Sequence, residues 1–139
     1  MNAPLYTTEV LRLAASLPEP VELERVDGSA ARRSSTCGSR IKSEVRIEDG
    51  RIAALSQTVL ACAFGQASAA LVAQQAPGRT RDEIEIALGQ LTAWLSGERD
   101  EPPQWPGYET LAPALPRTGR HGAILLPLRA LLGAMDGAV

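Results

Sequence analysis

The stretch IKSEVRIEDGRI, residues 41–52, decides the fold of this chain. Its odd-numbered side chains from residue 41 to residue 47 face one way, and the charged side chains between them face the other. This period of two is typical of a strand that is buried on one face and wet on the other. Asp49-Gly50 is typical of a two-residue type I′ turn, because both turn positions need positive φ. The pattern therefore predicts an antiparallel hairpin whose strands cover residues 41–48 and about 51–60.

Helical patterns follow the hairpin. Thr80 and Glu83 form a capping box, in which the hydroxyl accepts from the backbone amide three residues on and the carboxylate reaches back. This box starts a long amphipathic helix that Gly97 ends. Pro127 is tolerated only near the first turn of the last helix. The expected helices cover residues 63–75, 80–97, 108–115 and 123–135, with a surface loop over residues 98–107.

The region before the hairpin predicts one helix and one weak strand. Apolar residues recur at helical spacing over residues 6–17, and Pro18 stops this helix. Residues 21–25 predict a short strand, whereas residues 27–35 predict a loop because they are rich in Gly, Ser, Ala and Arg. The chain thus reads as a helix, a small antiparallel sheet of about three strands, and a run of helices. With the helices on one face of the sheet, this order predicts an α+β fold in a single domain over residues 1–139.

The charge balance argues against two classes of partner. Lys and Arg total 14 against 16 Asp and Glu, which gives a net charge of −2. Such a chain lacks the basic surface that non-specific nucleic-acid binding needs and the polybasic segment that holds a protein on a membrane. No apolar run approaches the roughly 20 residues that span a bilayer, and the first residues show no signal-peptide pattern. The expected compartment is the cytoplasm, where thiols stay reduced.

The residues that can carry chemistry are Cys37, Cys62 and His121. All three fall in loops or at the ends of expected elements, where functional sites usually lie. Cys62 is expected at a helix N-terminus, whose partial positive charge favours the thiolate that binds metals or attacks electrophiles. The spacing matches no zinc-finger pattern. The local patterns therefore leave three interpretations open: a metal site, two small buried cysteines, and a disulfide in an oxidised sample.

Several motifs, taken together, resemble the U-type iron–sulfur cluster scaffold family, which comprises IscU, SufU and the N-terminal domain of NifU. The resemblance runs through CGSRI at residues 37–41, EDGRI at residues 48–52 and ACAFGQASA at residues 61–69. It continues through GRT at residues 78–80, the acidic helix after it, and residues 115–121. It covers nearly the whole chain, and it implies the same α+β fold and a role in cluster assembly that is not enzymatic.

The resemblance also implies a ligand set. The family holds a nascent [2Fe-2S] cluster or a zinc ion on three cysteines, an aspartate two residues after the first cysteine and, in many members, a histidine beside the third. Carried over to this chain, the ligands are Cys37, Cys62 and His121. Ser39 stands at the aspartate position as a further, weak ligand, because its hydroxyl stays neutral near pH 7. Gly122 stands at the third cysteine position and contributes no side chain.

The function that this resemblance implies is a scaffold or carrier, whose partners are a cysteine desulfurase and the apo-proteins that receive the cluster. Five arginines flank the implied ligands: Arg32, Arg33, Arg40, Arg117 and Arg120. They either neutralise an anionic cluster, dock an acidic partner, or are ordinary solvated side chains.

Two other functions stay open. The missing thiolate and carboxylate favour a scaffold-like module that binds zinc or no metal and regulates a desulfurase. A cluster remains an alternative if an outside thiol, or a second subunit of a homo-oligomer, completes the ligand set. A thiol enzyme with Cys62 as nucleophile and His121 as base is the remaining alternative.

Overall fold

The computed structural model describes residues 6–35 and 38–137. Its elements follow the predicted order, with one helix, three strands and then a run of helices. In chain order they are α1 (Thr8–Ala15), β1 (Gly28–Arg33), β2 (Arg40–Glu48), β3 (Arg51–Leu60), α2 (Ala63–Gln75), α3 (Arg81–Ser96), the 3₁₀ helices η1 (Tyr108–Ala114) and η2 (Thr118–Arg120), and α4 (His121–Asp136). The three strands form one antiparallel sheet of order β1-β2-β3. The fold class is therefore α+β, as predicted.

The central hairpin is confirmed. β2 and β3 pair along their length, and Glu48 lies opposite Arg51 across the turn. Asp49 has a φ of 53° and Gly50 a φ of 75°, the two left-handed positions that a type I′ turn requires. The pairing register shifts between Arg46 and Ile47, an irregularity that adds local twist to the hairpin.

The third strand lies in a segment that the sequence predicted as a loop. The predicted strand over residues 21–25 is wrong, because that segment forms no strand and β1 begins only at Gly28. β1 has no β-branched residues and no alternating apolar pattern, so its pairing with β2 decides its conformation. Its small side chains also admit α4 closely, since a Cβ at Gly133 would lie 3.0 Å from the Cβ of Ala30.

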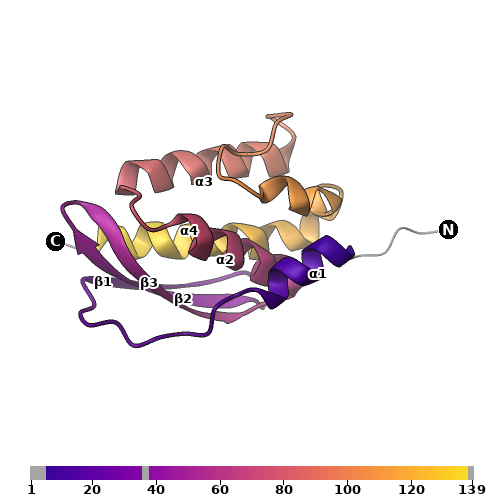
Figure 1. The fold of residues 1–139 in the computed structure, drawn as a ribbon. Helices are drawn as coiled ribbons and strands as arrows, with labels where there is room; N and C mark the ends of the chain where they lie inside the picture. The colour runs from indigo at the N-terminus through magenta and orange to yellow at the C-terminus, as the bar shows by residue number, and fades with distance from the viewer. Residues whose placement is uncertain (1–5, 36–37, 138–139) are drawn as a thin grey trace.

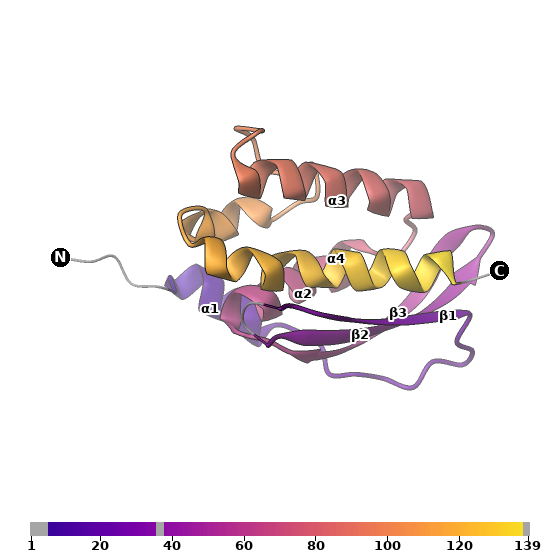
Figure 2. The ribbon, with the colours of Figure 1, turned by 180° about the vertical axis from the view of Figure 1, so that it is seen from behind.

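The helices lie on one face of the sheet, as predicted. Figures 1 and 2 show α2 and α4 over the sheet, and α3 beyond them on the side away from it. The β2 side chains of Ile41, Ser43 and Val45 point toward these helices and are buried. Trp94 and Trp105 are buried in the hydrophobic core.

The chain between α1 and β1 crosses the opposite, open face of the sheet (Figure 1). The backbone amide of Val21 donates to the hydroxyl of Ser56 at 3.0 Å. Further along, the Asp27 carboxylate accepts from the amide of Ile47 at 2.8 Å and from the Arg25 guanidinium at 2.7 Å. These bonds lower the pKa of Asp27, with the Arg25 hydrogen bond as the larger cause. The crossing segment therefore covers part of the open face and is held to β2 and β3 by specific bonds.

The helix ends follow the sequence closely for α3 and less closely for α4. Thr80 and Glu83 form the predicted capping box, and Gly97 ends α3 with a φ of 84°. The last helix, however, begins at His121 rather than at residue 123, because η2 leads directly into it. Pro127 consequently lies in the second turn of α4, so the prediction that it falls near the first turn is wrong.

A buried polar chain ties α2 to η1 and to α4. The Ser68 hydroxyl on α2 donates to the carbonyl of Ile124 on α4 at 2.7 Å. Since Ser68 has one proton to give, the Tyr108 hydroxyl on η1 donates to the Ser68 oxygen, at 2.8 Å. Ser68 and Tyr108 are both completely buried. Burial raises the pKa of Tyr108 far above its usual range, so the phenol keeps this proton.

We predict that Ser68→Ala destabilises the protein by about 1–3 kcal/mol, because it leaves buried polar groups without their partner. Urea unfolding with an unchanged slope would measure the loss of free energy. The matched control is Ser96→Ala, which removes an exposed hydroxyl that donates to the carbonyl of Ala93, and its free energy of unfolding should stay within about 0.5 kcal/mol of the original. Equal effects of the two substitutions would contradict a structural role for the buried chain.

Candidate functional site

The first turns of α2 and α4 lie against one another at one end of the molecule. A Cβ at Gly65 would lie 2.7 Å from the Cβ of Ala61 and 3.3 Å from the Cβ of Ala123. This spacing leaves no room for a side chain, so glycine allows α2 to approach α4 here. In Figures 1 and 2 both helices begin at the end that also holds α1. Because Cys62 precedes α2 and His121 begins α4, two of the sequence-predicted site residues share this end.

Cys62 is the N-cap residue of α2 and is partly buried. Its backbone is extended, with φ −66° and ψ 172°, and its side chain makes no capping hydrogen bond. A thiolate at this position lies beside the unpaired amides of the first helical turn, which favour negative charge. The predicted position of Cys62 at a helix N-terminus is therefore confirmed.

The His121 ring is held by two backbone carbonyls at the end of η1. Its Nε2 atom lies 2.9 Å from the carbonyl oxygen of Ala114 and 3.1 Å from that of Leu115. Carbonyl oxygens only accept, so Nε2 carries a proton. The described residues make no hydrogen bond to Nδ1, which in the neutral ring keeps its lone pair. The bonds thus fix both the tautomer and the ring orientation, as hydrogen bonds to metal-binding histidines commonly do.

The other implied positions are placed unevenly. Cys37 lies outside the described residues. Ser39 lies in the loop that enters β2, is 3% exposed, and accepts at its carbonyl oxygen from the amide of Ser34 at 2.8 Å. Gly122 is the second residue of α4. Within residues 6–35 and 38–137, no three His, Cys, Asp or Glu side chains are placed to hold a metal ion.

Four of the five flanking arginines divide into two groups, and the fifth, Arg32, lies on β1 with its guanidinium beside Gly133 of α4. Arg33 ends β1 and Arg40 begins β2, so they border the loop that contains Cys37, and both side chains are exposed. Arg117 and Arg120 lie at the two ends of the η2 turn that precedes His121. Both groups are close in sequence to an implied ligand, as the motif analysis predicted.

Sequence reasoning missed the residues that position the site. Ser68 and Tyr108 connect α2 to η1, and the carbonyls at the end of η1 hold His121. A serine inside an apolar helical pattern was the one signal for this role, because a buried hydroxyl must find a partner. Nothing in the sequence pairs that serine with a tyrosine 40 residues away.

No helix in the described part of the chain is long and apolar enough to cross a bilayer.

We predict that neutral His121 is protonated at Nε2 and bare at Nδ1. Long-range nitrogen–proton NMR correlations distinguish the two tautomers, and the assignment is direct because the chain has one histidine. A ring protonated at Nδ1 alone would contradict the hydrogen-bond arrangement at the end of η1.

Comparisons with known proteins place this fold. No protein-family model matches the chain, and neither does any curated protein sequence. A nitrogen-fixing NifU-like protein (N-terminal) from Brucella abortus superimposes with a TM-score of 0.89 at 25% identity, covering 96% of this chain and 94% of that one. A protein assigned as an iron–sulfur cluster assembly scaffold for the SUF system, from Fervidobacterium islandicum AW-1, has a TM-score of 0.76 at 17% identity, covering 94% and 96%. The predicted resemblance is therefore confirmed: over nearly its whole length, this chain is similar to the U-type iron–sulfur cluster scaffolds.

Proposed function

We propose that this protein is a non-enzymatic scaffold or carrier for iron–sulfur cluster assembly in the cytoplasm. Its cargo is a [2Fe-2S] cluster or a zinc ion, its ligands are Cys37, Cys62 and His121, and its partners are a cysteine desulfurase and the apo-proteins that receive the cluster. The observation that carries the proposal is the shared end of α2 and α4. There the Cys62 thiol lies at the N-cap of α2, and the His121 ring, whose Nδ1 is available, lies at the start of α4. The first turns of these two helices are in contact.

The chemistry of these groups fits a cargo of soft, positively charged metal ions. Cys62 supplies a thiolate, and His121 supplies a neutral nitrogen whose opposite N–H is already bonded. Two thiolates and one imidazole form a three-ligand set, which leaves a position for an incoming ligand such as water or a partner's side chain. An open position of this kind suits cargo that must be released rather than retained.

A second function is favoured by the residues at two ligand positions. Ser39 is buried and carries a hydroxyl where the scaffold family has a carboxylate, and Gly122 offers no thiol. A chain with this reduced set could keep the docking function of a scaffold while binding zinc or no metal, and so regulate a desulfurase. This second function shares the fold and the partner with the first, and differs from it in the cargo.

We predict that anaerobic reconstitution loads iron with matching acid-labile sulfide, and that Cys37→Ala and Cys62→Ala each abolish this loading. Iron, sulfide and zinc would be measured per chain in the three proteins, with Ser96→Ala as a control that leaves the site unchanged. Zinc without iron would favour the regulatory module. Unchanged iron and sulfide in both cysteine variants would overturn the ligand set.

The histidine offers a sharper test of the same site. In His121→Asn the side-chain oxygen falls near the position of Nδ1, whereas in His121→Gln the amide reaches toward the position of Nε2. We predict that the asparagine variant binds zinc on the order of tenfold more tightly than the glutamine variant, because only asparagine keeps an oxygen at the ligating position. Competition with a zinc-chelating dye measures the difference. Equal affinities would remove His121 Nδ1 from the ligand set.

A separate prediction tests the regulatory function. A protein that lacks both thiols (Cys37→Ala with Cys62→Ala) should still change the rate at which a cysteine desulfurase releases sulfide from cysteine, because docking does not require cargo. An unchanged rate at saturating concentrations of the variant would reject that function.

A further inference from the structure

Over the described residues, the open face of the sheet is exposed at the end nearest the candidate site. Two cross-strand rows occupy it: Ala31, Lys42 and Thr58 in one, and Arg33, Arg40 and Leu60 in the other. Their side chains point away from the helices, since they alternate with Ile41, which faces the helices. All six residues are exposed, and Leu60 is 59% exposed. Three cations and one large apolar side chain therefore share this part of the face, and one of the cations, Lys42, lies 3.9 Å from the Glu44 carboxylate.

The second row contains an unfavourable contact. Arg33 and Arg40 lie directly opposite one another on adjacent strands, an arrangement in which like charges repel and weaken the sheet. Among residues 6–35 and 38–137, no carboxylate pairs with either arginine, whereas the guanidinium groups of Arg25, Arg46 and Arg81 each have an acidic partner. A local conflict without local compensation is expected at functional positions.

A shallow groove of about 150 Å³ crosses the three strands at this point. Its lining is mostly apolar in area and consists of Ala31, Arg40, Ile41, Lys42, Thr58 and Leu60. A mostly apolar groove that also contains cations fits an apolar side chain that is flanked by carboxylates.

We propose that this basic open face, formed by Arg33, Arg40, Lys42, Thr58 and Leu60, docks a carboxylate-rich protein segment that places one apolar side chain in the groove. A second copy of this chain is a poor occupant, because a symmetric contact would bring the cations against their own copies. Nucleic acid is also a poor occupant, because the lining of the groove is mostly apolar and the chain as a whole is acidic, with a net charge of −2.

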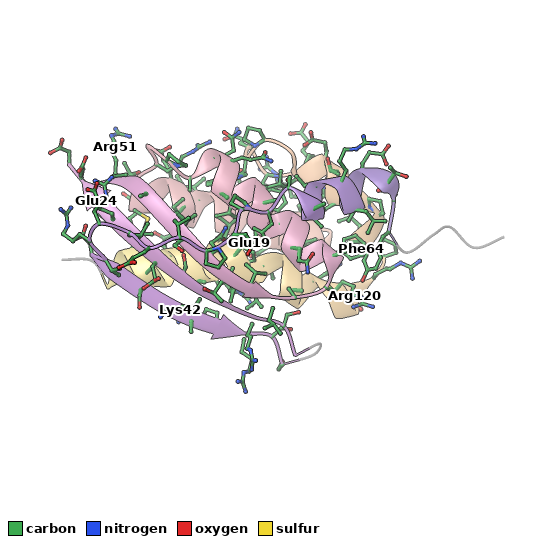
Figure 3. The ribbon with its side chains drawn as sticks, turned by 60° about the horizontal axis from the view of Figure 1, so that its bottom comes forward. Glu19, Glu24, Lys42, Arg51, Phe64 and Arg120 are labelled. Carbon is green, nitrogen blue, oxygen red and sulfur yellow. The ribbon has the colours of Figure 1, made fainter. Side chains whose placement is uncertain are left out.

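A segment of the chain itself already lies on the neighbouring part of the open face. The segment between α1 and β1 crosses the neighbouring part of the open face, and Figure 3 shows its Glu19 and Glu24, with Lys42 on the sheet. This segment is extended and acidic, and it is anchored by the bond from Val21 to Ser56. A partner segment of similar character would continue this cover toward the site.

The position of the face links docking to cargo. Leu60 lies two residues before Cys62, and Arg33 and Arg40 border the loop that contains Cys37. The identity of the partner as a protein that supplies or receives cargo rests on the proposed function, whereas the existence of the docking face does not.

The first test uses metal-free protein and two synthetic peptides. One has glutamates on both sides of a single leucine, and the other has glutamines in place of the glutamates. We expect the glutamate peptide to bind and to shift the NMR amide signals of Lys42, Thr58 and Leu60, with an affinity that falls as salt rises. Equal binding of the glutamine peptide, or tighter binding of a single-stranded RNA of similar charge, would overturn the proposal.

The decisive variant is Arg33→Glu, which replaces the repulsive cross-strand contact by an attractive one. It should weaken binding of the glutamate peptide on the order of tenfold while its urea midpoint stays level or rises. Arg129→Glu on α4 changes the net charge equally at an exposed position and should leave binding unchanged. Loss of binding together with a lower urea midpoint, or equal loss in both variants, would overturn the proposal.

Arg40→Gln is a second variant that removes the same repulsion without reversing a charge, and it should also weaken the peptide. Iron, zinc and sulfide per chain are measured separately in Arg33→Glu. If the original protein binds the glutamate peptide but takes up no metal on reconstitution, the docking face is supported and the cluster function is rejected. If it takes up metal but does not bind the peptide, the cluster function is supported and the docking face is rejected.

Discussion

The close contact between α2 and α4 at Gly65 is the constraint on which the rest of the structure depends. A side chain at Gly65 would collide with Ala61 and press on Ala123, so glycine lets the two first turns approach closely. Because Cys62 precedes α2 and His121 begins α4, this contact accompanies the location of both residues at the same end. The Ser68 bond to Ile124 then fixes the same pair of helices one turn further on.

The short helix η1 carries this order from the core to the candidate site. Its first residue, Tyr108, is bonded to Ser68 in the core, and the carbonyls at its other end hold the His121 ring. A change in the packing of α2 against η1 would thus move the carbonyls that bind the histidine ring. The buried chain supports the tautomer with the proton on Nε2, because it holds the short helix that carries these two carbonyls.

The electrostatics of this end differ from those of the chain as a whole. The chain has a net charge of −2, yet this end holds the N-termini of α2 and α4, and the exposed Arg33 and Arg40 lie at the ends of β1 and β2. Thiolates, sulfide and acidic partner segments are all favoured in such a field. In the proposed function, a ligand set with Ser39 and Gly122 at these two positions would hold its cargo less firmly.

The sequence by itself determined the hairpin of β2 and β3, the bounds of α2 and the capping box of α3, because alternation, a type I′ turn pair and caps act between near neighbours. It also indicated Cys62 and His121 through motifs that resemble a known family. Only the tertiary structure decided that residues 28–33 form β1, since that strand exists through its pairing with β2 and its contact with α4. The same holds for the His121 tautomer and the opposed pair of Arg33 and Arg40. These features arise from contacts between elements, whose partners a local pattern does not specify.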